Sequence, residues 1–449
     1  MIMLKLLPIA ALLASVVHAA PAFELQTSEH PAIASIERYA VQTPSKENIN
    51  YNGQFISVFP KGFGFAPGSG LALKKMDKDG TLYFWATGDR GPNADAPKVL
   101  EGEKKREAKI FLAPDYAPRF AEIKVTRKQS ADVISSKPFL IDGELASGLP
   151  LPKGTVGSTG EVALTDGLKT LNANTRGIDP EGIVADKNGK LWVVDEYGPF
   201  LMHVDAASGK VLKQLAPGAG LPEVLKHRQP NRGFEAVAVT PNGKVYAMLQ
   251  STLNIDGETK STAQFIRLVE FDPSTGATRM LAYPLDVDAY KKTGDAKIGD
   301  LVAIDNTRFA LIEQGKGKDK KLRNVLYVID IAGADNLVAI DGKEPEFASK
   351  DALANVKMIR KQRVLDLREL GWTAEKAEGL ALFENGIAVM NDNDFGLKSE
   401  LASGKDVDDL LIKDGQLPDG DRLVVAPSAE TTDLWLLNLK QPLKNYFPK

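Results

Sequence analysis

The chain has 449 residues, no cysteine, four histidines and a formal net charge of −3 at pH 7. The absence of cysteine excludes disulfides, thiolate zinc sites and cysteine nucleophiles, and so few histidines argue against a multi-histidine metal centre. The nearly balanced charge gives no electrostatic footprint for nucleic acid, so we expect no nucleic-acid partner.

The first twenty residues are typical of a secretory signal peptide. Lys5 supplies an early positive charge, an apolar run follows, and small residues surround Ala19 and Ala20. The alternative is a membrane anchor, but the apolar run is shorter than the roughly 20 residues that span a bilayer. We therefore expect cleavage of residues 1–20, a periplasmic or secreted location without a membrane anchor, and one domain over residues 24–447.

A short phrase, an acid followed by an apolar strand, recurs along the rest of the chain. It reads Asp-Pro-Glu-Gly-Ile-Val-Ala at 179–185, and related phrases occupy 233–239, 298–304 and 376–382. Each phrase precedes a turn and a second, more hydrophobic strand, at 191–194, 245–249, 309–312 and 387–390. A copy at 69–73 leads to a strand at 82–85 but has Ser69 in place of the acid. Repeats on this scale indicate a radial or linear array.

Short β-branched and aromatic runs, separated by Asn-Gly, Asp-Gly and Ser-Gly turns, predict an all-β fold. Four strands per repeat predict a β-propeller with four-stranded antiparallel blades. From Glu181 onward the repeat acids are 54, 65 and 78 residues apart, whereas the step from Ser69 to Glu181 is 112 residues.

The longer step leaves room for one eroded blade, built from residues 109–112, 121–125 and 139–141, so the best count is six blades. A C-terminal strand at 434–437 could pair with an N-terminal strand near 36–41, which would close the ring and protect its edges. A pair of β-sandwiches is the rival architecture, but it does not explain the repeated phrase.

The repeat acids begin their strands, and further acids end the second strands. In an antiparallel sheet these two positions share one edge, so the side chains should converge on one mouth of the channel. Two carboxylates about 4 Å apart repel by about 4 kcal/mol at an effective dielectric of 20, so either protons or a cation must balance them. For any single acid, a solvated turn or strand cap is the alternative. The polar residues expected at this mouth include Asp394 and the predicted metal ligands Glu181, Asp195, Glu196, Glu235, Asp300, Glu378 and Asp392.

Oxygen ligands alone favour Ca²⁺, with Mg²⁺ and Mn²⁺ as alternatives. Arg90 and Arg232 lie beside acids in the sequence, as expected of groups that bind an oxyanion substrate. The alternative for these arginines is an ordinary ion pair that holds the loops together. Asp89 or Glu313 could orient a metal-bound water as general base.

Taken in order, these phrases resemble the family described as "esterase-like activity of phytase", a set of exported bacterial propeller proteins. The resemblance implies a β-propeller and suggests phosphoester hydrolysis with a divalent metal. Gln250 departs from the pattern, which often has a glutamate there, and Gln314 follows Glu313 where an arginine is usual. The matching segments are 68–72, 87–92, 177–183, 194–199, 231–235, 298–301, 377–380 and 391–395.

We therefore predict an exported, metal-dependent phosphoester hydrolase that acts on a small-molecule phosphoester or another oxyanion and is a monomer. One alternative is a non-catalytic propeller that binds a ligand or partner and holds a structural cation. The other is a carboxylester or lactone hydrolase with the same calcium centre. Fold alone does not choose between them.

Overall fold

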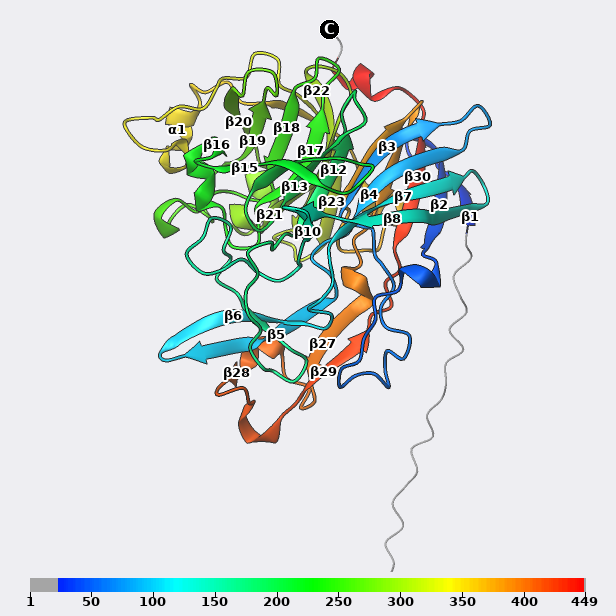
Figure 1. The fold of residues 1–449 in the computed structure, drawn as a ribbon. Coiled ribbons are helices and arrows are strands. Elements are labelled where there is room, and N and C mark those ends of the chain that lie inside the picture. The colour runs from blue at the N-terminus through cyan, green and yellow to red at the C-terminus, as the bar shows by residue number, and fades with distance from the viewer. Residues whose placement is uncertain (1–22, 448–449) are drawn as a thin grey trace, which may run out of the picture.

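The computed structural model describes residues 23–447, and in them five four-stranded antiparallel units surround one axis as the blades of a propeller (Figure 1). The predicted signal peptide, residues 1–20, lies outside the described residues. The blades are numbered here in chain order by their innermost strand. The all-β propeller with four-stranded antiparallel blades is thus confirmed.

From the axis outward, the strands of the blades follow one another along the chain, except in blade 5. Blade 1 contains β3 (Gly70–Met76), β4 (Leu82–Thr87), β7 (Arg119–Thr126) and β8 (Ser130–Pro138). Blade 2 contains β12 (Pro180–Ala185), β13 (Leu191–Asp195), β14 (Phe200–Val204) and β15 (Val211–Pro217). Blade 3 contains β17 (Phe234–Val239), β18 (Val245–Leu249), β19 (Phe265–Phe271) and β20 (Thr278–Pro284). Blade 4 contains β21 (Ala296–Ala303), β22 (Arg308–Lys316), β23 (Leu322–Asp330) and β24 (Arg360–Asp366).

Blade 5 joins the two ends of the chain. It contains β25 (Gly379–Phe383), β26 (Gly386–Met390), β30 (Asp433–Leu439) and the N-terminal β2 (Ile33–Gln42), with β1 (Phe23–Thr27) along its outer edge. In the antiparallel pairing of β2 with β30, Ile36 lies opposite Leu437. This confirms the predicted closure of the ring. A short parallel pairing of β2 with β8 also connects blade 5 to blade 1.

The structure has five blades within residues 23–447, where the residue spacing suggested six. The inner strands β3, β12, β17, β21 and β25 are neighbours in that order, and β25 also packs against β3. The three segments assigned to a sixth blade lie in different places: residues 109–112 around the end of β6, 121–125 in β7 of blade 1, and 139–141 around β9. The long step between inner strands holds insertions, which residue spacing alone does not distinguish from a blade.

These insertions and others form a second unit that we call the cap lobe, which lies below the propeller in Figure 1. One of its sheets combines β5 (Asn93–Glu101), β6 (Lys104–Phe111), β11 (Val162–Leu164) and β28 (Leu411–Ile412). The other pairs β27 (Leu397–Leu401) with β29 (Leu423–Pro427). The lobe has its own hydrophobic core, which includes Ile110, Leu164, Ile412 and Val425.

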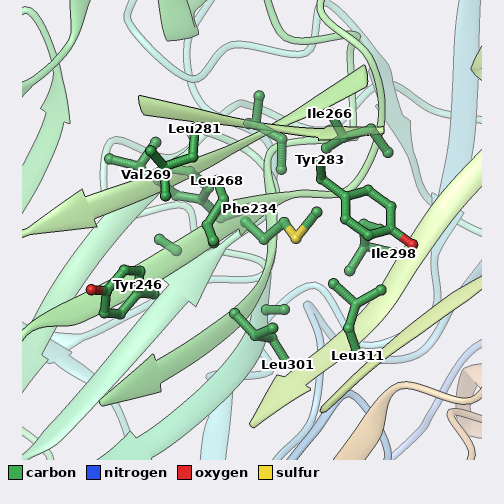
Figure 2. Close-up of a cluster of buried hydrophobic side chains, with 14 of the residues drawn as sticks. Phe234, Tyr246, Ile266, Leu268, Val269, Leu281, Tyr283, Ile298, Leu301 and Leu311 are labelled. Carbon is green, nitrogen blue, oxygen red and sulfur yellow. The ribbon is translucent and has the colours of Figure 1, made fainter. Parts of the chain in front are cut away.

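The blades are held together by apolar side chains that fill the space between adjacent sheets. Figure 2 shows this packing between blades 3 and 4, where Phe234, Leu268 and Leu281 face Ile298 and Leu311. Alternate residues of a strand point to opposite faces, so each buried sheet packs against both of its neighbours. Burial of one such side chain contributes about 1.5–3 kcal/mol, and the sum makes the ring a rigid frame for side chains at its axis.

Little helix is present in the part of the chain that the structure describes. One α-helix, α1 (Lys350–Leu353), lies in the connection between β23 and β24, and short 3₁₀ turns connect other strands. The minor strands are β9 (Leu140–Ile141), β10 (Glu144–Leu145) and β16 (Gly220–Leu221). No helix among residues 23–447 has the length and apolar character needed to cross a membrane.

Candidate functional site

Glu181, Glu235 and Glu378 lie where their inner strands begin, whereas Asp300 is the fifth residue of β21. β-Bulges orient Glu181, Glu235 and Asp300. The register of β12 with β13 skips Glu181, and the register of β17 with β18 skips Glu235. The register of β21 with β22 skips a pair that includes Asp300. A bulge takes the extra residue out of the regular alternation of a strand. Glu378 directly precedes β25, and its backbone N–H donates to the Met390 carbonyl at 3.1 Å.

Glycines in these phrases let the inner strands approach closely. A β-carbon on Gly182 would lie 3.0 Å from the carbonyl oxygen of Glu235, and one on Gly70 would lie 2.8 Å from the carbonyl oxygen of Glu181. A side chain at either position would force neighbouring blades apart, which is why glycine suits such close backbone approaches. The narrow axis that results brings acids from different blades together.

Eight acids form three groups, and in each group one carboxylate oxygen per residue lies within 4.8 Å of the others. Two groups share Glu181, and we call them together the Glu181 centre: Asp179, Glu181, Glu196, Glu235 and Glu378. The third, which we call the Asp392 group, comprises Asp89, Asp392 and Asp394. All of these residues except Asp394 are buried. The predicted convergence of acids from several blades is therefore present in the structure.

Burial and mutual repulsion act on the protonation of the Glu181 centre. Burial, and then the charge of neighbouring acids, raises the pKa values of Glu181 and Glu235 well above their ordinary range. Burial also raises the pKa of Glu196 to about 8 and that of Glu378 to about 7. Without a metal ion the centre therefore retains protons near neutral pH, and a divalent cation could replace them.

The donor atoms of the Glu181 centre fit a hard divalent cation. Its side chains offer only oxygen, the ligand that Ca²⁺, Mg²⁺ and Mn²⁺ prefer. Gln250 adds a further oxygen: its Nε2 donates to Glu196 Oε1 and to Glu235 Oε2, both at 2.8 Å, while its buried Oε1 has no hydrogen-bond partner among the described residues. An unpartnered amide oxygen beside several carboxylates is suited to metal coordination.

The Glu181 centre lines a cavity of about 510 Å³ between the propeller and the cap lobe. Asp89 and Asp394 also line this cavity, and Asn93 and Lys398 of the cap lobe form part of its wall. A second cavity of about 320 Å³ shares the side chains of Arg232, Lys297, Lys376 and Glu378 with the first. We call its basic wall the lysine groove: Lys291, Lys297, Lys316, Lys318, Lys320 and Lys376.

The two predicted oxyanion-binding arginines both line the acidic cavity but differ in their contacts. Arg90 Nη1 lies 3.2 Å from Glu161 and its Nε lies 3.5 Å from Asp179, so this buried guanidinium connects loops of blades 1 and 2. Arg232 Nη1 donates to Ser251 Oγ at 3.1 Å and to the Gly294 carbonyl at 2.6 Å. Among residues 23–447 no acid forms an ion pair with Arg232, which leaves its charge for a ligand.

Two predicted metal ligands, Asp195 and Asp300, lie outside the three acid groups, and backbone donors hold both oxygens of each. Asp195 accepts hydrogen bonds from Asp179 N at 2.6 Å and from Gly198 N at 2.9 Å. Asp300 accepts from Leu301 N at 2.7 Å and from Leu380 N at 2.6 Å, which connects blade 4 to blade 5. Burial raises the pKa of Asp195 to about 8.

Glu313, predicted as a possible general base, faces away from the acidic cavity. Its Oε2 accepts from Tyr283 Oη at 2.7 Å and lies 3.0 Å from Lys361 Nζ, between blades 3 and 4. The next residue, Gln314, points the other way and donates to Glu378 Oε1 at 3.2 Å. Neighbouring residues of a strand project to opposite faces, so only Gln314 reaches the site.

Sequence reasoning did not assign Asp179, Lys297 or Lys376 to the site. Asp179 lies two residues before Glu181, and Lys376 lies two residues before Glu378. This shared offset is a signal that could have identified both residues. The basic run Gly-Lys-Gly-Lys-Asp-Lys at 315–320, in a turn between two strands, could have indicated the groove.

A sequence model of the phytase-like family, described as "esterase-like activity of phytase", matches residues 65–395. A protein of Arthroderma benhamiae, named an uncharacterized secreted protein, is 28% identical over 253 residues, which cover 47% of this chain and 49% of that protein. The chain thus spans about half the length of this relative.

Solved structures resemble the chain only distantly. A protein from Lactobacillus plantarum is 12% identical with a TM-score of 0.32, covering 92% of this chain and 99% of that one. The catalytic domain of the Coprinopsis cinerea GH62 α-L-arabinofuranosidase is 10% identical with a TM-score of 0.35, covering 92% and 99%. Similarity this low carries no conclusion about activity.

Proposed function

The chain belongs to the phytase-like family, and from that premise we propose that it is an exported, metal-dependent hydrolase of phosphoesters. The observation that carries the proposal is the Glu181 centre, in which five buried carboxylates from three blades converge. Three of them, Glu181, Glu196 and Glu235, have no ion pair within 4.0 Å among residues 23–447. The predicted signal peptide and the secreted relative support export.

The residues of the Glu181 centre, with Gln250 Oε1, would hold the cation. A bound divalent ion would polarise a phosphoryl oxygen and lower the pKa of a water molecule. Asp89 lines the same cavity, and only one of its oxygens is held by a backbone donor, Gly91 N at 2.7 Å. We therefore assign the positioning of water to Asp89, rather than to Glu313.

An anionic substrate fits the basic groups beside the acids. Arg232 has no acidic partner among the described residues, and none of the four lysines at positions 291, 316, 318 and 320 forms an ion pair with an acid of residues 23–447. A neutral carboxylester or lactone would gain little from these charges, whereas a phosphate group would be attracted by them. The lysine groove therefore favours phosphoester hydrolysis over the lactonase alternative.

Arg90, Asp195 and Asp300 act on the site through other residues. Arg90 pairs with Asp179, and the Asp195 carboxylate accepts from the Asp179 backbone, so both hold Asp179 in the centre. Asp300 holds β21 against β25, which begins directly after Glu378. We propose that Arg90 and Asp195 maintain the position of Asp179, whereas Asp300 supports the contact between blades 4 and 5.

Hydrolysis of an aryl phosphate and of an aryl acetate, each with calcium and with a chelator, tests the proposal. We expect phosphate release that the chelator and Glu181→Gln both abolish, and little acetate hydrolysis. Glu400→Gln is the matched control because it removes the same charge from a side chain that is exposed on the cap lobe. Phosphate release that persists in Glu181→Gln, or acetate hydrolysis alone, would contradict the proposed phosphoester hydrolysis. A protein that binds metal but hydrolyses neither substrate would support a non-catalytic binding propeller. N-terminal sequencing of exported protein tests cleavage after residue 19 or 20.

A further inference from the structure

One acid group already contains a positive charge from the chain itself. Lys376 Nζ lies 3.0 Å from Asp392 Oδ2 and 2.8 Å from Asp394 Oδ1, and it lies 3.7 Å from Glu378 Oε2. Its side chain is 28% exposed and lines both cavities. The ammonium group therefore lies beside the Asp392 group, at its boundary with the Glu181 centre.

The Lys376 ammonium group contacts three carboxylates, two of which belong to the Asp392 group. The acids of this group also have backbone donors: Asp394 N donates to Asp392 Oδ1 at 3.0 Å, and Gly91 N donates to Asp89 Oδ1 at 2.7 Å. The Asp392 group is thus largely satisfied by the chain's own donors.

In the part of the chain that the structure describes, the Glu181 centre meets chain cations only at two of its five acids, Asp179 beside Arg90 at 3.5 Å and Glu378 beside Lys376 at 3.7 Å. Among residues 23–447 no lysine or arginine forms an ion pair within 4.0 Å of Glu181, Glu196 or Glu235. Lys297 lines the same cavity, but it pairs with none of these acids at that distance. The Asp392 group therefore has an ammonium group within 3.0 Å of two of its three acids, whereas Glu181, Glu196 and Glu235 have no such partner among the described residues.

We propose that Lys376 is a specificity-determining residue that takes the cation position of the Asp392 group and so confines divalent metal to the Glu181 centre. Only the statement that metal is confined to the Glu181 centre rests on the proposed function. Removal of this ammonium would leave three clustered carboxylates without a cation, and an oxygen-only site of that kind attracts a hard divalent ion. Lys376→Met should therefore create an additional calcium site.

Equilibrium dialysis against calcium, followed by metal analysis of the protein, measures the number of bound ions. We expect Lys376→Met to bind one more calcium ion per chain than the wild type. Lys376→Arg retains the charge and should bind the wild-type number. Lys297→Met removes a lysine that lines the same cavity without a close acidic partner, and it should also bind the wild-type number.

The double variant Lys376→Met with Asp394→Asn should lose the added ion, which would place it in the Asp392 group. An unchanged calcium number in folded Lys376→Met, or a gain that also occurs in Lys297→Met, would overturn the proposal. Asp394→Asn alone provides a test if Lys376→Met does not fold. It should leave the calcium number at the wild-type value, and loss of one ion would overturn the proposal because that group would then hold metal beside the lysine.

The same data separate this inference from the proposed function. A wild-type chain without bound calcium would remove the Glu181 metal centre. A gain of one ion in Lys376→Met would still support the role of Lys376 in that case. Chelator-sensitive phosphate release with no gain in Lys376→Met would support the proposed function and overturn this inference.

Discussion

Asp300 and Glu235 lie at β-bulges in the innermost strands of adjacent blades, yet their contacts predict different effects of substitution. Both oxygens of Asp300 accept backbone hydrogen bonds, from Leu301 at 2.7 Å and from Leu380 at 2.6 Å. Asparagine has one acceptor oxygen, so Asp300→Asn would leave one buried N–H without a partner. That loss costs about 1–3 kcal/mol of the free energy of unfolding. We expect the cost to be the same in calcium and in chelator.

Glu235→Gln should instead remove stabilisation that depends on calcium. A ligand that binds only the folded state at about one hundred times its dissociation constant stabilises it by about 2.7 kcal/mol. Because Glu235 belongs to the Glu181 centre, the substitution weakens that binding and should reduce the difference between calcium and chelator. In chelator, we expect this variant to be no less stable than the wild type, since one repelling buried acid is gone.

Thermal unfolding followed by circular dichroism, in calcium and in chelator, compares both variants with the wild type. The expected pattern is a constant loss for Asp300→Asn and a diminished calcium shift for Glu235→Gln. If Asp300→Asn abolished the calcium shift, Asp300 would be a metal ligand rather than a support between blades. If Glu235→Gln retained the full shift, calcium would bind somewhere other than the Glu181 centre.

Three further predictions concern stability, pH and substrate charge. Arg267 is 1% exposed and makes two hydrogen bonds to Glu346, at 2.7 and 2.6 Å, so Glu346→Gln should cost about 3 kcal/mol in urea unfolding; a loss below about 1 kcal/mol would contradict the importance of this buried pair. Burial alone would raise the pKa of Glu37, but hydrogen bonds from Arg127 and Tyr39 outweigh it and lower the pKa. The stability from this ionised acid is present above the unfolded pKa and disappears as the pH falls through the lowered native pKa. Glu37→Gln should therefore cost about 1.5–3 kcal/mol of the free energy of unfolding at pH 7 and progressively less below about pH 4. A cost independent of pH would refute this. Substitution of Lys316, Lys318 and Lys320 of the lysine groove by glutamine should raise KM for an aryl phosphate several-fold at low salt, with little change in kcat. An unchanged KM would show that the groove does not attract substrate.

The repeated phrase predicted the blades, and strand patterns near the two ends of the chain predicted the closure of the ring. Each repeated strand-turn-strand unit forms the two inner strands of a blade, and residues 434–437 pair with residues 36–39. The number of blades was not predictable in the same way. The insertion that builds β5 and β6 lies between the second and third strands of blade 1. The spacing between inner strands therefore counts residues of the cap lobe together with those of the blade.

The convergence of acids was also predictable, but the role of each acid was not. Glu181, Glu235 and Asp300 have equivalent places in the repeat, yet only Asp300 gives both oxygens to backbone donors of its own and the next blade. Glu313 and Gln314 are adjacent, and the strand's alternation selected the amide for the cavity. Such outcomes depend on bulges and on contacts between blades, which a local pattern does not contain.

In the proposed function, the carboxylates around Glu181 hold a divalent cation. Anomalous diffraction from crystals soaked in manganese chloride tests it most directly, because the manganese signal locates the ion without reference to activity. We expect an anomalous peak bonded to the Glu181 carboxylate, absent from crystals of Glu181→Gln treated in the same way. A peak that does not contact Glu181, or a cavity that stays without manganese under saturating soaks, would contradict it.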